Sequence, residues 1–554
     1  MRETGRSDSR IDRAQRVTLF ALIVLLCLAS NAHRGLVQPD EGRYAEIPRE
    51  MLVSGDWIVP HLNGLSYVEK PPLQYWATAA AYRVFGTYAW VSRLWNLVLG
   101  LAGIAVVFAT GRKLWGPRAG EFAALVLLST PLYILVGQLN LLDMGLTFFL
   151  TGALCAFLLA QRADADPAST RHYMWLCWAS VGFGFLQKGL VAFAVPFLVL
   201  VAYSLLQRDG AIWRRLHLLA GIVIVGALSL PWLVALGLRD TAYAQYFLIH
   251  EHFTRFLTTE HHRDEAWWYF LAILAAGALP WIGLMLRATA EALRREATPA
   301  FNAAAALALW ALLVVAFFSL SGSKLAPYIM PCLPPLALLA GKRLAQQQRR
   351  SDFALVLATG AVLACLLLIA RTVTDARMTP GPAKDAYLAV GAWAQAAGAV
   401  AALAVVIALW ALRRGRTRLA MLCFGLGTHV TWMVFLGGAN IMADHRGAPG
   451  AAALMRPHVA RGEAFYCVGA YLQSLSFDLE RTCTLVEYTG ELEIQFERDR
   501  GKGPLSFEQF ADAWRSGATG VALVHKDFLP RMASAGLGSK IVARYPDFDI
   551  VEHP

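Results

Sequence analysis

Long apolar runs constrain this chain more than any other feature. A helix needs roughly 17 to 25 apolar residues to cross the hydrocarbon of a bilayer. We count about thirteen such runs, to within one or two, at 17–34, 90–111, 119–137, 140–160, 173–187, 189–206, 217–238, 266–286, 303–320, 324–341, 353–371, 388–412 and 419–438. Since 57% of the residues are hydrophobic and 16% charged, the sequence predicts a mainly α, polytopic membrane protein.

Basic residues indicate the orientation. Five Arg precede the first run, and alternate connections such as "GRKLWGPR", "QRDGAIWRRLH" and "GKRLAQQQRRSD" are rich in Lys and Arg. Such loops stay cytoplasmic. The first run has no small-residue cleavage site behind it, so we interpret it as a retained helix. The Arg-rich start of the chain predicts a cytoplasmic N-terminus, and an odd number of crossings then predicts an extracytoplasmic C-terminus. The net charge of +11 is explained by these loops, not by nucleic acid binding.

The chain changes character after residue 438. Residues 439–554 have short β-like stretches, "AFYCV", "CTLVEY", "GVALVH" and "KIVARY", and a helical pattern in "SFEQFADAWRSG". We therefore expect a transmembrane domain over 1–438 and a small extracytoplasmic α/β domain over 439–554. Cys467 and Cys483 lie in this second domain, where a disulfide is compatible with an oxidising compartment. Their spacing leaves open whether it forms.

The predicted first outer loop, about 33–89, is too long for a simple connection. It contains "QPDEGRYAEIPREM", with Asp40, Glu41 and Arg43, and "YVEKPPLQYW", with Glu69 and Lys70. Charged groups so close to hydrocarbon indicate function. The alternative for Asp40 is a helix cap, because an acid at a helix start is favourable. The alternative for the second block is an interfacial anchor.

Further ionisable residues fall on the same predicted side. Asp143 is a carboxylate at the outer end of an apolar run, and an Asp is too short to snorkel far. Lys188 lies between two runs, where it is either a topological anchor or a phosphate contact. In "SLSGSKLAPYIMPC", Lys324 and Tyr328 stand at the outer start of a Pro-interrupted helix, which favours anion binding.

The predicted loop 239–265 concentrates four of the chain's 13 His. His250 with a carboxylate could ligate Zn²⁺ or another divalent ion, although no recognised metal-binding spacing is present. The alternative is a polar loop facing lipid phosphates. Arg255 is a candidate phosphate ligand, because a guanidinium forks onto phosphate.

Together, "PDEGRYAE", "YVEKPPLQYW", a later outer-side acid and "SGSKLAPYIMPCLPPLALL" resemble the polyprenyl-phosphate-sugar-dependent GT-C glycosyltransferases. Among these the chain is most similar to the bacterial aminoarabinose transferases that modify lipid A, which are relatives of the protein O-mannosyltransferases. The resemblance implies transfer of 4-amino-4-deoxy-L-arabinose from undecaprenyl phosphate to a lipid A phosphate at the periplasmic face of the inner membrane, by a monomer.

The resemblance also implies roles for the residues. Asp40 is the expected catalytic carboxylate and Asp143 the second acid. The expected donor- and substrate-binding residues are Glu41, Arg43, Tyr44, Tyr67, Glu69, Lys70, Lys188, Arg255, Lys324 and Tyr328. No cofactor is expected to be obligatory, and Glu69 with His250 is the candidate contact for a divalent cation.

Two alternatives stay open on the sequence. Enzymes that move another polyprenyl-linked sugar, such as protein O-mannosyltransferases, share much of the pattern, and the motifs do not specify the sugar or the lipid A phosphate. A lipid transporter would also have many helices, but its charges should lie at mid-membrane on broken helices. Here they gather at one face, which favours an enzyme.

Overall fold

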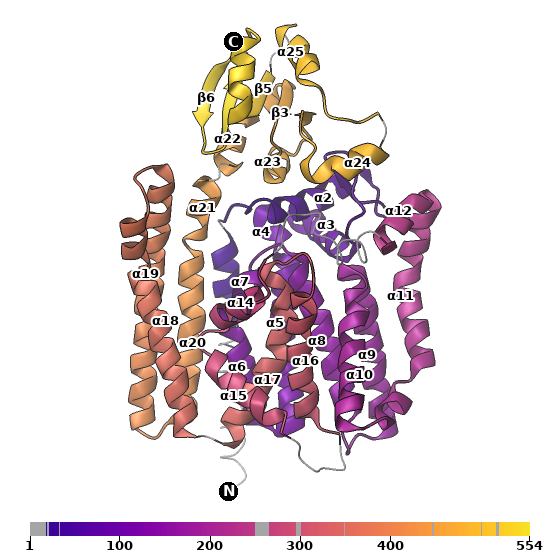
Figure 1. Ribbon diagram of the computed structural model, residues 1–554, viewed down its shortest axis with the longest axis vertical. Helices are drawn as coiled ribbons and strands as arrows, with labels where there is room; N and C mark the ends of the chain where they lie inside the picture. Colours follow the sequence, from indigo (N-terminus) through magenta and orange to yellow (C-terminus); the bar gives the residue numbers. More distant parts are fainter. Residues whose placement is uncertain are drawn as a thin grey trace.

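The computed structural model describes residues 18, 21–32, 34–249, 265–294, 301–347, 349–445, 448–499, 501–516 and 520–554. It has three tiers along its longest axis (Figure 1). A bundle of long helices forms the first tier, a layer of short helices lies on one end of it, and an α/β domain stands on that layer.

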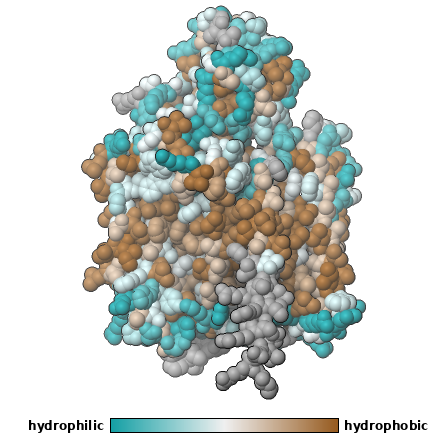
Figure 2. Space-filling view, turned by 180° about the vertical axis from the view of Figure 1, so that it is seen from behind, coloured by the Kyte–Doolittle hydropathy of each residue, from teal (hydrophilic) through white to brown (hydrophobic). Residues whose placement is uncertain are grey.

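The bundle consists of apolar helices. After the helix Ala21–Ala32 they are α5 (Leu94–Trp115), α6 (Pro117–Leu128), α7 (Pro131–Gly137), α8 (Leu142–Ala160), α9 (Pro167–Lys188), α10 (Val191–Gln207), α11 (Leu218–Arg239), α14 (Tyr269–Gly277), α15 (Ile282–Ala292), α16 (Ala303–Ser319), α17 (Leu333–Gln346), α18 (Arg350–Arg377), α19 (Pro382–Arg413) and α20 (Thr417–Leu436). An apolar belt crosses the face shown in Figure 2, between two hydrophilic zones. Leu219 and Leu238 of α11 are both 83% exposed, as expected for side chains that face lipid.

Within the described residues, six helices are long and apolar enough to cross a membrane, and up to eight if each of two bent pairs is one span. The pairs are α6 with α7, bent by 65°, and α14 with α15, bent by 114°. Pro131 and Pro280 lie at these breaks, where a proline cannot continue the hydrogen-bond ladder.

Each of the predicted apolar runs coincides with helical structure in the described residues. The run at 173–187 belongs to a longer helix, α9, which Asp166 caps by accepting from the backbone N–H groups of Ala168 and Ser169. Its first turns are polar, so hydropathy alone hides them. The run at 324–341 begins with the 3₁₀ helix η3 (Ala326–Cys332) before α17. That about thirteen segments cross the membrane stays a prediction.

The middle layer comes mainly from the predicted first outer loop. It contains α2 (Asp40–Ser54), the hairpin β1 (His61–Leu62) and β2 (Leu65–Ser66), α3 (Leu73–Phe85) and α4 (Ala89–Ser92), with α12 (Thr241–Gln245) at its edge. Residues 41–51 of α2 are all buried, because the bundle covers the helix on one side and the C-terminal domain on the other. A Cβ on Gly42 would lie 2.6 Å from the backbone N of Ser474, so this contact requires glycine.

The C-terminal domain is α/β. Its helices are α21 (Ala439–His445), α22 (Ala448–Ala460), α23 (Gln473–Leu479), η4 (Gly490–Leu492), α24 (Glu493–Arg498), α25 (Phe507–Arg515), η5 (Lys526–Phe528) and α26 (Leu529–Ser534). Its strands are β3 (Ala464–Val468), β4 (Thr484–Val486), β5 (Gly520–His525), β6 (Lys540–Arg544) and β7 (Phe548–Glu552).

These strands form one mixed sheet of order β4-β3-β5-β7-β6. β3 pairs in parallel with β4 and β5, and β7 is antiparallel to β5 and β6. The four stretches expected to be strands are β3 to β6, and the expected helix is α25. β7 was not predicted, because its acids Asp549 and Glu552 break up its apolar residues. Cys467 and Cys483 are both buried free thiols.

Candidate active site

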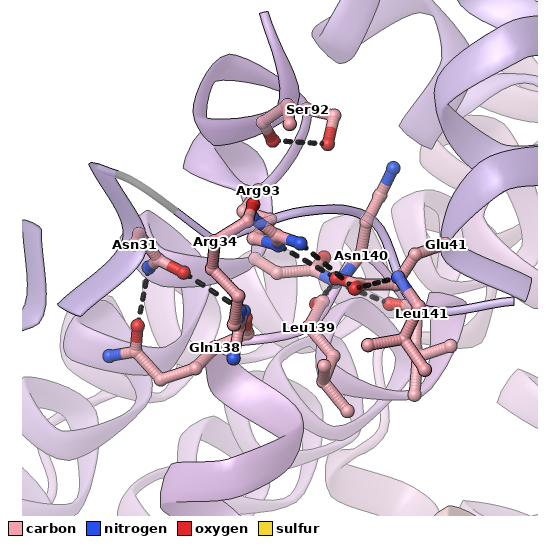
Figure 3. A network of polar contacts seen from close by, with 12 residues as sticks. Asn31, Arg34, Glu41, Ser92, Arg93, Gln138, Leu139, Asn140 and Leu141 are labelled. Carbon is pink, nitrogen blue, oxygen red and sulfur yellow. Dashed lines mark hydrogen bonds and ion pairs between the residues drawn. The ribbon is translucent and has the colours of Figure 1, made fainter. Parts of the chain in front are cut away.

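The adjacent acids of α2 have different environments. Glu41 is 2% exposed, and its carboxylate accepts hydrogen bonds from Arg93 Nε at 2.8 Å and Arg93 Nη2 at 2.9 Å. It also accepts from the backbone N–H groups of Val37 at 2.9 Å and Asn140 at 2.8 Å. Figure 3 shows this network, in which Arg93 also donates to the carbonyls of Arg34 and Gly35.

Glu41 is therefore engaged inside the protein, where we had expected a substrate contact. Burial by itself would raise the pKa of Glu41, but the charge and hydrogen bonds of Arg93 outweigh it and lower that pKa to about 2. A carboxylate with these four donors is a structural anchor. It ties the start of α2 to α5 and to the connection before α8.

Asp40 is the first residue of α2 and is not its cap. Pro39 is at the N-cap position, and no side chain caps this helix. The Asp40 side chain is 36% exposed, and its Oδ1 lies 3.5 Å from Arg43 Nη2. Successive helix residues point about 100° apart, so Asp40 stays accessible while Glu41 is anchored.

Arg43 organises the site around Asp40. It donates from Nη1 to the Tyr67 hydroxyl at 3.1 Å, and its guanidinium lies 5.8 Å from the centre of the Tyr44 ring. Tyr67 is fully buried and Tyr44 nearly so. Burial raises the pKa of Tyr67 well above its usual value despite the nearby Arg43, so this hydroxyl stays neutral.

A residue from the C-terminal domain completes this cluster. Glu491 of η4 has its Oε2 2.5 Å from Arg43 Nη2, and Gln473 donates a hydrogen bond to its other oxygen. The sequence analysis missed both residues. Each is one polar residue among many in the tail, and no local pattern connects them to α2.

The second predicted acid has a basic partner. Asp143 lies in the first turn of α8, and its Oδ1 is 2.6 Å from Nζ of Lys188, the last residue of α9. Nζ of Lys188 is also 4.5 Å from the centre of the Tyr328 ring. The structure thus brings Asp143, Lys188 and Tyr328 together at one end of the bundle.

Polar side chains link the two clusters. The backbone N–H of Asn140 donates to Glu41, while its side-chain oxygen accepts from Gln74 at 2.7 Å. The Gln74 oxygen accepts from Gln187 at 2.8 Å, and Gln187 precedes Lys188. All three amide residues are buried, so the network fixes α2, α3 and α9 relative to one another.

A cavity of about 760 Å³ opens beside the second cluster. Its polar lining consists of Glu69, Lys70, Lys188, Ser321, Ser323 and Tyr328. The rest is apolar and follows α10 as far as Trp213 of η1 (Ala211–Arg215). Its lining on α10 runs from Val191 to Leu200, so the apolar groove follows this helix for about 14 Å. Such a cavity is suited to a molecule with a charged head and a long hydrocarbon tail.

Glu69 and Lys70 lie at the polar end. Lys70 Nζ donates to the backbone carbonyl of Glu69 at 3.1 Å, and Gln495 of α24 donates to Glu69 Oε1 at 3.5 Å. Lys324 does not line the cavity, and its Nζ donates to the carbonyl of Glu265 at 2.9 Å.

Two expected ligands, His250 and Arg255, lie outside the described residues. In the part of the chain that the structure describes, no group of three His, Cys, Asp or Glu side chains could hold a metal ion. The expected contact of Glu69 with His250 therefore stays a prediction.

Sequence comparisons agree with this architecture. Residues 14–282 match the family model of dolichyl-phosphate-mannose-protein mannosyltransferases, and residues 451–553 match the aminoarabinose transferase C-terminal domain. The undecaprenyl phosphate-alpha-4-amino-4-deoxy-L-arabinose arabinosyl transferase of Pseudomonas paraeruginosa is 37% identical over 68% of this chain and 69% of its own length.

The structural match covers nearly the whole molecule. ArnT from Cupriavidus metallidurans, in a crystal structure with undecaprenyl phosphate bound, has a TM-score of 0.90 and 32% identity over 98% of both chains. The apo form of the same protein gives a TM-score of 0.88. The chain belongs to the aminoarabinose arabinosyl transferases. This membership confirms the predicted GT-C relationship and decides for a glycosyltransferase over the transporter considered above.

As an arabinosyl transferase, the protein uses a polyprenyl-phosphate-linked sugar donor. Its multi-pass, mainly helical architecture in the inner membrane agrees with the sequence prediction.

Proposed function

We propose that this arabinosyl transferase passes 4-amino-4-deoxy-L-arabinose from undecaprenyl phosphate to a phosphate of lipid A, at the periplasmic face of the inner membrane. The observation that supports this proposal most is the cavity. Its polar end suits the donor's phosphate and sugar, and its apolar groove along α10 suits the prenyl chain.

The reaction needs little from the protein beyond positioning and charge. The lipid A phosphate oxygen attacks the anomeric carbon, the bond from that carbon to the donor phosphate oxygen breaks, and undecaprenyl phosphate leaves. Lys70 and Lys188, both lining the cavity, stabilise the negative charge of the departing phosphate. Tyr328 orients Lys188 from the cavity wall, and Asp143 fixes its ammonium group.

Asp40 is the catalytic carboxylate in this proposal. An ionised phosphate acceptor needs no strong base, so Asp40 acts by orienting the acceptor and stabilising positive charge on the sugar ring. Arg43, which contacts Tyr44 and Tyr67, positions Asp40, and Glu69 binds the sugar. Glu41 serves as an anchor. From the sequence alone, we keep Arg255 as a ligand of the donor phosphate.

The proposed orientation follows from the apolar helices. The basic N-terminus is cytoplasmic, and because about thirteen segments cross the membrane, the C-terminal domain, residues 439–554, is periplasmic. The unit of function is a monomer.

Catalysis needs no obligatory metal in this proposal. A divalent cation such as Zn²⁺ would be held by Glu69 and His250, and no step depends on it. We expect a chelator to leave turnover of the purified enzyme within about twofold, whereas an essential metal would cost orders of magnitude.

The test uses the purified full-length chain in liposomes with the undecaprenyl-linked aminosugar and lipid A. Mass spectrometry should detect lipid A with one added aminopentose. Asp40→Asn should abolish this product, while Asp512→Asn, the same change at a side chain that is 80% exposed in the C-terminal domain, should retain it. Unmodified lipid A beside a glycosylated protein would overturn the acceptor. Near-normal turnover by folded Asp40→Asn would overturn the site.

A further inference from the structure

The C-terminal domain contacts Arg43 and Glu69 of the site through Glu491 and Gln495, and the proposed function gives it no role. Segment 483–502 of this domain contacts the outer loop at several points. The backbone N–H of Ser66 donates to Asp499 at 2.9 Å, and Lys502 donates to the carbonyl of Gly64 at 3.0 Å. Asn63 exchanges two hydrogen bonds with the Cys483 backbone. The segment is thereby held against the loop that presents Glu69 and Lys70.

Within this segment, Glu491 lies among other charges. It contacts Arg43 at 2.5 Å, on the same guanidinium that Asp40 approaches to 3.5 Å. Burial raises the pKa of Glu491 although Arg43 opposes the shift, and Glu69 and Asp40 are near enough to raise it further. The carboxyl groups of Asp40, Glu69 and Glu491 thus lie near one another and near Arg43, and Lys70 follows Glu69 in the chain. Three carboxyl groups here outnumber these two cations.

Two glutamines of the same domain add hydrogen-bond acceptors. Gln473 donates its amide to Glu491, and Gln495 donates its amide to Glu69. Both side chains are 2% exposed, and neither amide oxygen has a hydrogen-bond partner among the described residues. Each glutamine therefore uses a donor on a carboxylate and leaves an acceptor free, which is costly when buried without a ligand or water.

A negative, acceptor-rich site suits an ammonium group, which has three donors, a positive charge and no acceptor. The amino group of the donor sugar is on C4, across the pyranose ring from the anomeric carbon that bears the phosphate. A protein group that binds this amine should face the groups that bind the phosphate from across the ring. Figure 1 shows α24, directly after Glu491, above the middle layer and α9, which ends at Lys188, below it.

We propose that Glu491, with the free oxygens of Gln473 and Gln495, recognises the protonated amine of the donor sugar, so that the C-terminal domain determines specificity for an aminosugar. Arg43 holds Glu491 and Asp40 in position for the same substrate. This inference rests on the proposed function, because it assumes that an aminosugar is the group transferred.

The test compares two synthetic donors, the amine and its N-formylated form, which has the same ring without the positive charge. For the purified full-length enzyme, Glu491→Gln should lower kcat/KM with the amine donor by about 10- to 100-fold, as expected for a lost charged hydrogen bond. It should change kcat/KM with the formylated donor by less than about threefold.

Glu493→Gln is the matched control, because it makes the same change two residues away at an exposed side chain; it should leave both values unchanged. If Glu491→Gln does not fold, Gln495→Met removes an acceptor and should selectively lower the amine value by about 3- to 10-fold. An equal loss with both donors would show a structural role and overturn the inference. If the wild-type enzyme transfers neither sugar to lipid A, the proposed function itself fails.

Discussion

At the scale of single residues, the adjacent acids Asp40 and Glu41 have different surroundings: Asp40 is 36% exposed and Glu41 is buried. Sequence reasoning could not distinguish them, because both are acids at the start of one helix. The distinction comes from Arg93, which is fully buried and directs its guanidinium at Glu41.

The Glu41 pair predicts a pH dependence of stability. The pKa of Glu41 is about 2, below its ordinary value of 4.5, so its stabilising effect is present above about pH 5 and is lost as the pH falls toward 2. The shift corresponds to about 3 kcal/mol. Lowering the pH from 7 to 3 should therefore destabilise the wild type more steeply than Glu41→Gln. Thermal unfolding in detergent measures this difference.

Glu508→Gln, at an exposed position, should follow the wild-type pH profile in the same experiment. Equal pH slopes for the wild type and Glu41→Gln would contradict the role assigned to the Arg93 contact. The Glu41 variant should also be less stable at pH 7 by about 3–5 kcal/mol, since it leaves Arg93 buried without a counter-charge.

The Asp143–Lys188 pair should act as one unit in turnover. Asp143→Asn and Lys188→Met should each lower kcat/KM, and the double variant should lose less than the product of the two losses. The coupling expected for a close, largely buried ion pair is about 10- to 100-fold. Initial rates with the aminosugar donor measure it.

The Arg418–Glu121 pair is the control, with its nearest atoms at 2.9 Å and Arg418 52% exposed. Its double-mutant cycle should leave turnover unchanged. Strictly multiplicative losses at Asp143 and Lys188 would mean that Asp143 does not act through Lys188.

At the scale of elements, the contact between α2 and α23 determines whether the C-terminal domain reaches the site. Gly42→Ala places a methyl carbon 2.6 Å from the backbone N of Ser474, and this backbone has to move. We expect a loss of about 1–3 kcal/mol from overpacking and a clear loss of turnover as Glu491 withdraws from Arg43.

Limited proteolysis of the C-terminal domain and turnover should therefore change together in Gly42→Ala. Gly226→Ala on α11 is the control, because its added carbon meets nothing closer than 3.5 Å. Full turnover by Gly42→Ala would show that the two helices separate without consequence for the site.

Much of the element order could be read from the sequence, but the long-range partners could not. Apolar length is a local property, so the predicted runs coincide with helices. The start of α2 at Asp40 and the helix after "EKPP" follow from local signals as well. By contrast, the contacts of Arg43 with Glu491 and of Glu41 with Arg93 depend on tertiary packing, which a single sequence does not record. The hydrogen bonds of Gln74 with Asn140 and Gln187 could not be predicted for the same reason.

At the scale of the whole molecule, the orientation remains to be measured. We expect a reporter enzyme that is active only outside the cytoplasm to function when fused after Pro554. The same reporter fused after Arg349, in a predicted cytoplasmic connection, should be inactive. Activity of both fusions or of neither would contradict the three crossings predicted between Arg349 and the C-terminus.

The contact between Ser66 and Asp499 joins residues 433 positions apart. Ribosomes add about 5–20 residues per second, so the outer loop waits about 20 to 90 s for its partner. During this interval the loop lacks Glu491 and the hydrogen bonds that hold Asn63, Gly64 and Ser66. The enzyme therefore acquires its complete site late in its own synthesis, and a prematurely terminated chain holds its membrane helices without a finished sugar pocket.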